Sequence, residues 1–219
     1  MVSAAEIVAL QDRLTREWHG PAEEHPDGSA DGAAASGETA GSDAGGEWLT
    51  LVERQHRANF DLWHIEDEAR APDAGDAEIA RVKRQIDRTN QMRSDLVEEL
   101  DRAIQDWLKA RGLPNPDAPL NSEPPGMMID RLSILALKIY HTREEADRKD
   151  APAGHAELNS SRLAILEEQR ADLAGCLDAL WQETLGGKRR FKLYRQLKMY
   201  NDPALNPAIY GKSGASKIT

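Results

Sequence analysis

An acid and a base stand side by side in the most apolar run of the chain, where Asp130 and Arg131 lie within residues 127–139. Because removing an unpaired charge from water costs several kcal/mol, each side chain must reach solvent, pair with another group or line a site. The other candidate site residues of this segment are Asn121, Glu123, Lys138 and His141. These groups could line a cleft between helices that binds an anion, or Asp130 and Arg131 could be buried pairs that fix the helix register.

A second polar group falls on the helix predicted for residues 47–70, where helical spacing sorts the side chains into two adjacent stripes. One stripe holds His56, Phe60, His64 and Asp67, and the other holds Asn59, Trp63, Glu66 and Arg70. His56 and His64 are eight residues apart, about 12 Å along the axis, which is too far for one metal ion. The Glu-x-x-His step of di-iron bundles occurs once, at Glu53, with no second copy. We therefore predict no metal site on this helix, and the sequence leaves the cofactor unknown.

A third polar group lies on the helix predicted for residues 76–111, at steps of three and four. Its members are Asp87, Asn90, Gln91, Ser94, Glu98 and Asp101, and we count Arg93 of the same helix among the candidates. Taken alone, this is the solvated face of an amphipathic helix. The acids could equally meet Arg or His residues of a neighbouring helix, and Arg131 is one candidate partner.

Catalytic signatures are missing from the sequence, which has no P-loop, no His-Glu-x-x-His, no Cys-x-x-Cys and no Gly-x-Ser-x-Gly elbow. The sequence has a single cysteine, Cys176, so no internal disulfide can form. The apolar helical pattern around Cys176 predicts an inert core position. The N-terminus lacks the pattern of a signal peptide, and the most apolar window falls short of the ~20 residues that span a bilayer. We expect a cytoplasmic protein with no membrane span.

The charge of the chain is divided between an acidic body and a basic tail. Residues 188–219 hold eight Lys or Arg and one acid, a formal charge of +7, so residues 1–187 carry −17 of a total of −10. A basic tail could bind an anion, an acidic partner or the acidic body of the same protein. Because so acidic a body repels a polyanion, we predict no nucleic-acid partner and favour a small phosphorylated ligand.

The elements that must position these residues are helices, because aromatic residues make up only 5% and Ala, Leu, Glu and Arg are abundant. We predict an all-α fold, an elongated antiparallel bundle of four to five main helices, with no heptad run regular enough for a free-standing coiled coil. Besides those named above, helices are expected at 3–18 with Ser3 as N-cap, from the Pro-rich loop to about 148 with Ser122 as a candidate N-cap, at 154–185 and, short and basic, at 188–200. The helix that holds Asp130 is expected at the centre of the bundle.

The domain organisation follows from composition. We predict a short N-terminal helix over 1–19, a disordered acidic linker over 20–46, a helical bundle domain over 47–210 and a disordered tail over 211–219. The linker holds seven Gly and no Ile, Leu, Val or aromatic residue, so it cannot bury enough apolar surface to order itself.

Four stretches resemble an uncharacterised bacterial helical family, domain of unknown function 4254. They are residues 56–70, residues 86–101, residues 120–141 and residues 194–210, with His-Arg-Ala-Asn-Phe-Asp-Leu-Trp-His, Ile-Asp-Arg-Thr-Asn-Gln-Met-Arg-Ser-Asp and Met-Tyr-Asn-Asp-Pro as matching runs. The resemblance brings no established activity. It implies a companion of glycosyltransferases in bacterial surface-polysaccharide loci.

Three functions stay open at this point. The first is an accessory protein that binds an anionic sugar-nucleotide-like ligand or a glycosyltransferase through Arg131, Lys138, His141 and the basic tail. The second is a metal-assisted hydrolase or transferase that uses His56 or His64 with Glu66, Asp67 and Asp130 for acid–base work. The third is a structural helical scaffold, in which Asp130 and Arg131 pair and no cleft adjoins them. Whether the chain forms a homo-oligomer is also open.

Overall fold

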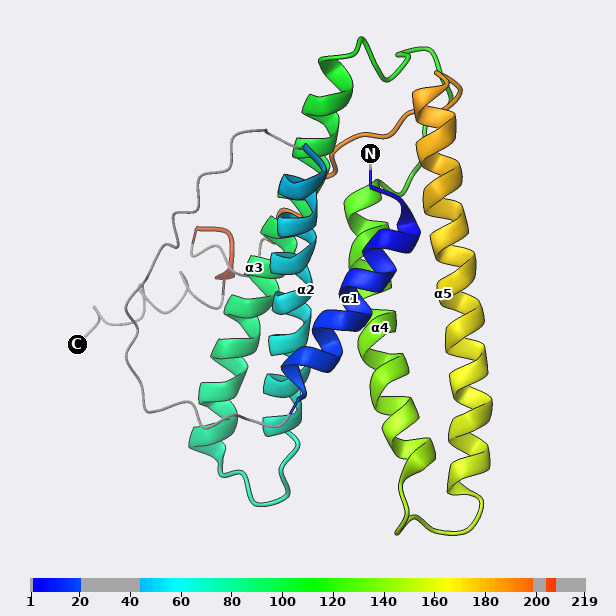
Figure 1. The fold of residues 1–219 in the computed structure, drawn as a ribbon. Coiled ribbons are helices and arrows are strands. Elements are labelled where there is room, and N and C mark those ends of the chain that lie inside the picture. The colour runs from blue at the N-terminus through cyan, green and yellow to red at the C-terminus, as the bar shows by residue number, and fades with distance from the viewer. Residues whose placement is uncertain (1, 21–43, 199–203, 208–219) are drawn as a thin grey trace, which may run out of the picture.

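The protein is a bundle of long helices (Figure 1). The computed structural model describes residues 2–20, 44–198 and 204–207. Within them the chain forms α1 (Ala4–Trp18), α2 (Ala44–Glu68), α3 (Asp76–Lys109), α4 (Pro125–Asp147) and α5 (His155–Leu185). The predicted all-α bundle is therefore confirmed. None of the described helices is both long enough and apolar enough to cross a membrane.

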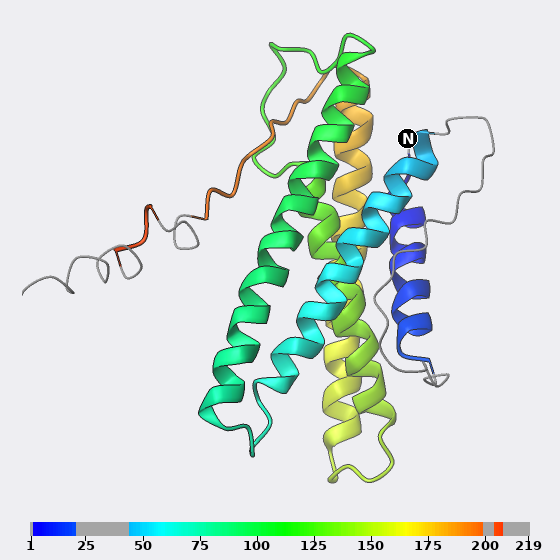
Figure 2. The ribbon, with the colours of Figure 1, turned by 90° about the vertical axis from the view of Figure 1, so that its left-hand side faces the viewer.

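Helix α4 is the centre of the bundle, as predicted, because it contacts all four other helices. Helices α2 and α3 pair on one side of it and α5 lies on the other, while α1 crosses over α4 (Figures 1 and 2). Its apolar side chains Ile129, Leu132, Leu137 and Ile139 are each at most 2% exposed. Burying four such side chains contributes about 1.5–3 kcal/mol each. The site residues of α4 are therefore held on the most enclosed helix of the fold.

The ends of the helices follow local signals, with two differences from the predictions. Ser3 caps α1 through a capping box with Glu6, and Gly186 ends α5 as expected. Ser122 is not the N-cap of α4, since that position is taken by Pro124, which has no side chain that could accept a hydrogen bond. The predicted linker 20–46 and the predicted tail 211–219 lie almost entirely outside the described residues, and α2 starts three residues inside that linker.

The predicted basic helix at 188–200 is wrong, because residues 190–198 run without helical structure. Two contacts hold the start of the segment against the bundle. Arg190 forms a parallel bridge with Leu120, and Phe191 is only 3% exposed. Further along, the backbone amide of Gln196 donates to Glu98 on α3, at 2.8 Å. These long-range contacts keep the segment extended, and they override the helical propensity of its Lys, Arg and Leu residues.

Helices α3 and α4 approach each other closely at Gly126. The Asp101 carboxylate of α3, 1% exposed, accepts a hydrogen bond from the backbone amide of Gly126 at 2.6 Å. It thereby satisfies an N–H group of the first turn that Pro124 cannot cap. A Cβ atom at Gly126 would lie 2.6 Å from the carbonyl oxygen of Val97 and 2.9 Å from the Asp101 side chain. Only glycine fits here without moving α3 away from α4.

We predict that Gly126→Ala lowers the free energy of unfolding by about 2 kcal/mol or more, because the added methyl group overlaps backbone that cannot give way. The measurement is urea denaturation followed by circular dichroism. Gly175→Ala is the matched control: Gly175 lies within α5, and nothing stands within 4 Å of a Cβ there. That variant is expected to gain about 0.5–1 kcal/mol from helix propensity. Equal effects of the two substitutions would contradict the close approach at Gly126.

Candidate functional site

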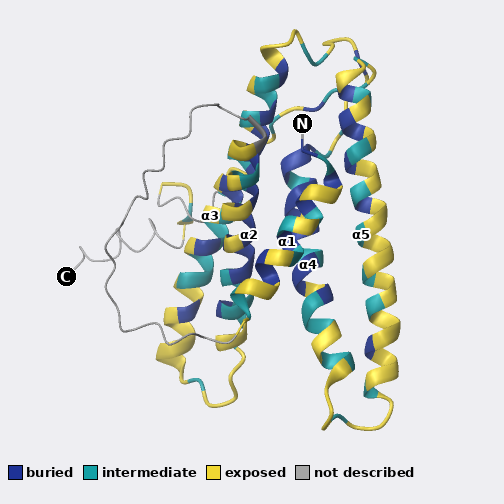
Figure 3. Ribbon diagram, in the orientation of Figure 1, coloured by how far each residue is buried: buried dark blue, intermediate teal, exposed yellow. Residues whose placement is uncertain are grey.

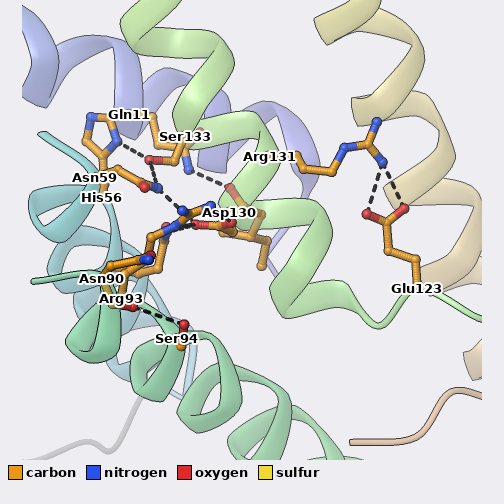
Figure 4. A network of polar contacts seen from close by, with 12 residues as sticks. Gln11, His56, Asn59, Asn90, Arg93, Ser94, Glu123, Asp130, Arg131 and Ser133 are labelled. Atoms are coloured by element: carbon orange, nitrogen blue, oxygen red, sulfur yellow. Dashed lines mark hydrogen bonds and ion pairs between the residues drawn. The ribbon is translucent and has the colours of Figure 1, made fainter. Parts of the chain in front are cut away.

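The Asp130 carboxylate is the centre of a buried polar network that joins α2, α3 and α4 (Figure 4). Its Oδ1 accepts hydrogen bonds from Gln55 Nε2 at 2.6 Å, Asn59 Nδ2 at 3.0 Å and Arg93 Nε at 2.7 Å. Arg93 Nη2 donates to Oδ2, which makes the contact bidentate. The Asp130 side chain is 12% exposed and the Arg93 side chain 24% exposed. The charge of the Asp130 carboxylate is thus balanced by the Arg93 guanidinium. The hydrogen bond between Arg93 and Asp130 raises the pKa of Arg93.

The network continues from α4 through α2 to α1, and its direction can be assigned atom by atom. Asn59 Nδ2 donates to Ser133 Oγ at 2.9 Å, and Ser133 Oγ lies 2.7 Å from His56 Nδ1. His56 Nε2 lies 2.9 Å from Thr15 Oγ1, whose own proton goes to the carbonyl oxygen of Gln11. Thr15 must therefore accept from His56 Nε2–H, which leaves Nδ1 to accept the proton of Ser133. His56 is held as one neutral tautomer.

Ser133 and His56 have the spacing of a nucleophile and its base, but both side chains are 0% exposed. No substrate can reach the hydroxyl without opening the bundle. Burial also lowers the pKa of His56 to about 4, well below the ordinary value of 6.5. The pair therefore joins α4 to α2 and α1, and His56 offers no free nitrogen to a metal or a reacting group.

Arg131 lies on the other side of α4 and does not pair with Asp130. Its Nη1 donates to both carboxylate oxygens of Glu123 at 2.9 Å, and the Arg131 side chain is 56% exposed. The expectation that Arg131 and Asp130 form one buried pair is therefore wrong, and so is the expectation that Arg131 meets the acids of α3. Arg93, not Arg131, is the cation that reaches Asp130.

A groove of about 670 Å³ runs between α4 and α5 and contains two predicted cations. It is lined by Glu123, Met128, Arg131, Ile134, Leu135, Lys138, Gln169, Asp172, Leu173 and Cys176. Cys176 is exposed here, so the prediction of an inert core cysteine is wrong. A neighbouring hollow of about 390 Å³ shares Lys138 and Gln169 with this groove and extends it to His141. The loop residue Asn121 stands outside both hollows and donates to the carbonyl oxygen of Glu123 at 2.7 Å.

A smaller cleft of about 350 Å³ gathers further candidates between α2, α3 and α4. It is lined by Asn59, Leu62, Trp63, Glu66, Asp67, Arg70, Arg93, Ile134 and Leu137. Its charges are largely paired within the protein, because Arg70 contacts Glu66 at 3.1 Å and Arg93 is held by Asp130. Both cations of the cleft are therefore already paired with carboxylates of the protein.

Apart from Arg93 and Asp101, which bind α4, the acidic and amide candidates on α3 face solvent or contact the basic segment. Asp87 pairs with Lys83 on the exposed face of the helix. Glu98 accepts from the backbone of Gln196, and Lys198 Nζ donates to the carbonyl oxygen of Asn90 at 2.7 Å. The basic segment therefore contacts the body of the same protein through α3.

His64 and His141 come together with a residue that the sequence did not single out, His19 at the C-terminal end of α1. One ligand atom from each of these three side chains lies within 4.8 Å of the others. Gln11, Thr15 and Gln55 of the network were missed as well. Gln11, Thr15 and His19 follow one another at steps of four next to the apolar stripe of α1, and that polar stripe was the signal for all three.

We predict that Asp130→Asn lowers the free energy of unfolding by about 2–4 kcal/mol, because Arg93 is left as a mostly buried cation without its anion. The neighbouring substitution Arg131→Ala removes only an exposed ion pair, so about 0.5 kcal/mol or less is expected. Chemical denaturation of both variants at neutral pH measures the difference. Similar losses would mean that the two charges do not have separate roles.

We predict an acid-sensitive stability that depends on His56. The unfolded chain takes up a proton on this residue below pH 6.5, whereas the folded protein does so only near pH 4. The stabilisation is therefore complete above pH 6.5 and is lost as the pH falls from 6.5 to 4, by up to about 3 kcal/mol. Thermal denaturation across this range should show a shallower fall for His56→Gln, although that variant is less stable at pH 7.

Asp101 changes the stability with pH in the opposite direction from His56. It is present in both the wild type and the His56→Gln variant. Burial raises its pKa to about 7, so the folded protein holds a proton there that the unfolded chain releases above its ordinary value of 3.8. Its contribution to stability falls as the pH rises from 3.8 to 7. The contribution of His56 is therefore the difference between the stability–pH curves of the wild type and of His56→Gln, and neither curve alone gives it. Parallel curves would contradict its assigned role.

Comparison with known proteins gives one match, to the family described as Protein of unknown function (DUF4254), over residues 49–193. No curated protein and no solved structure matches the chain. The matched region holds most of α2, all of α3, α4 and α5, and the bridge between Leu120 and Arg190. It includes Asp130 with all of its partners, whereas α1 lies before it. Since this region is about two thirds of the sequence, the chain belongs to the DUF4254 family.

Proposed function

We propose that this protein is a cytoplasmic, non-catalytic accessory factor that binds an anionic, sugar-nucleotide-like ligand and acts with a glycosyltransferase in surface-polysaccharide metabolism. The observation that carries the proposal is the groove between α4 and α5, which presents Arg131 and Lys138 along one wall. The kind of ligand is also suggested by the companionship with glycosyltransferases that the resemblance implies.

The two cations are spaced to hold an extended anion. Arg131 and Lys138 are seven residues apart on α4, which is two helical turns or about 10 Å along its axis. Arg can bind a phosphate through two parallel hydrogen bonds, and Lys acts as a point charge. The exposed contact between Arg131 and Glu123 contributes about 1 kcal/mol at most, so an incoming phosphate can replace it.

The rest of the groove fits the neutral parts of such a ligand. Asp172 and Gln169 of α5 face the cations across the groove and can accept hydrogen bonds from sugar hydroxyls. Met128, Ile134, Leu135 and Leu173 provide apolar surface for a ring. A mixture of apolar lining and few polar groups is typical of small-molecule sites.

The enzymatic and scaffold alternatives have less support. The hydrolase hypothesis uses His56 or His64 with Glu66, Asp67 and Asp130. Of these groups, His56 has both nitrogens engaged, Asp130 is already bound by three side chains, and Glu66 is paired with Arg70. The scaffold hypothesis needs Asp130 and Arg131 to pair with no cleft beside them. Asp130 does have a structural role, but Arg131 lines the largest of the hollows described above.

The test is isothermal titration of the full chain with a nucleoside diphosphate sugar, with inorganic pyrophosphate and the free nucleoside as separate arms. We expect binding of the nucleotide sugar and weaker binding of pyrophosphate. Each of Arg131→Ala and Lys138→Ala should weaken binding about tenfold, because each removes one charge-assisted contact.

Arg143→Ala is the matched control, because Arg143 lies on α4 and pairs with Glu167 of α5 outside this groove. Its affinity should equal that of the wild type. Absence of binding in all three arms, or an equal loss in the control, would exclude the groove as the binding site.

A further inference from the structure

We propose that His19, His64 and His141 form a binding site for a zinc-class divalent transition-metal ion. The three residues come from the end of α1, from α2 and from α4, so the site exists only in the folded bundle. One ligand atom from each lies within 4.8 Å of the other two. In a tetrahedral zinc site with Zn–N distances near 2.0–2.1 Å, ligand nitrogens are about 3.4 Å apart. Small side-chain rotations would therefore bring the three rings onto one ion.

The hydrogen bonds of two of these rings match those of metal-bound histidines. His19 Nδ1 lies 2.7 Å from the carbonyl oxygen of Thr15, which can only accept, so Nδ1 carries the proton. His141 Nδ1 lies 3.0 Å from Glu144 Oε2 in the same way. A ligand histidine usually donates its second ring nitrogen to a carbonyl or carboxylate oxygen, which fixes the tautomer and directs the free lone pair to the metal.

The remaining nitrogens are the second, independent observation. Nε2 of His19 and Nε2 of His141 are both buried, and neither has a hydrogen-bond partner. A buried acceptor without a donor costs about 1–3 kcal/mol, and such groups are rare in native proteins. A cation bound between the rings would satisfy both nitrogens at once.

Aromatic side chains hold the three rings in place. Tyr140 stacks on His19 with ring centres 4.3 Å apart, and Trp63 stacks on His141 at 4.8 Å. Phe60 meets the edges of His19 and His64 at 4.7 and 4.5 Å. Burial in these surroundings lowers the pKa of His64 and of His141, which keeps both imidazoles neutral and able to bind a metal at pH 7.

The donor set indicates which metals fit. Three imidazoles suit zinc, cobalt, nickel or copper and not calcium or magnesium, which prefer oxygen ligands. Three protein ligands leave a fourth position for water or another ligand, as in open zinc sites. His141 also lines the hollow that continues the α4/α5 groove, so the open position would be next to that groove.

The experiment is titration of the chelator-treated full chain with zinc, and with cobalt followed by its visible absorption, in the absence of any nucleotide. We expect one equivalent of metal, a cobalt spectrum of low coordination number and a rise in the melting temperature on adding zinc. His64→Ala and His19→Gln should each weaken binding by about 100-fold or more, since each removes one of three ligands. Glu144→Gln, which removes the charge from the group that binds His141 Nδ1 and also contacts Tyr140, should weaken binding about tenfold.

His155→Ala is the control, because His155 contacts Glu145 through Nε2 and is not part of the cluster. It should bind metal as the wild type does. Circular dichroism checks that each variant is folded. If His64→Ala does not fold, His19→Gln still tests the proposal, because its side-chain amide can donate to the carbonyl oxygen of Thr15 as His19 does. No saturable binding of zinc or cobalt overturns the proposal. So does binding that survives in the cluster variants and is lost in Cys176→Ser. Neither result bears on the nucleotide-sugar proposal, whose test uses no metal.

Discussion

The bundle depends on neutralising one buried carboxylate. Asp130 lies on the helix that all the others contact, and its side chain is only 12% exposed, so neighbouring side chains rather than water must stabilise most of its charge. Gln55 and Asn59 of α2 and Arg93 of α3 must all be in place to satisfy it. A buried charge that loses its partner costs more free energy than most apolar contacts return. The position of α2 and α3 against α4 is therefore specified by this group, while apolar packing supplies most of the stability.

The two charges that are adjacent in the chain have different roles because α4 is covered on both sides. Neighbouring residues of a helix point about 100° apart, so Asp130 faces α2 and α3 whereas Arg131 faces the α4/α5 groove. At the interface with α2 and α3, three side chains donate hydrogen bonds to the Asp130 carboxylate. The other interface is a groove, in which the exposed Arg131 side chain pairs with the half-buried Glu123. Figure 3 shows the same contrast, with buried residues concentrated where α1, α2 and α4 meet and exposed residues along much of α5.

Helix α1 lies before the family match yet completes both polar clusters. It supplies Gln11 and Thr15 to the buried network and its C-terminal cap, His19, to the histidine cluster. The segment that joins it to α2 lies mostly outside the described residues. Because Gln11 Nε2 donates to the carbonyl oxygen of Ile129, α1 is fixed to α4 by polar contacts as well as by its apolar stripe.

What the sequence by itself determined is local in the chain. The helices, the capping box of Ser3, the glycine end of α5 and the central place of α4 could all be predicted, because periodicity and caps act over a few residues. Most residues that form the polar clusters could be nominated too, since polar side chains in apolar helices are conspicuous. Only the tertiary structure decided the partners: Arg93 rather than Arg131 for Asp130, His19 beside His64 and His141, and an extended course for residues 190–198. Partner choice depends on which faces of distant helices meet. Helical spacing holds no information about residues that are far apart in the chain, and even Arg93 and Asp130 are 37 positions apart.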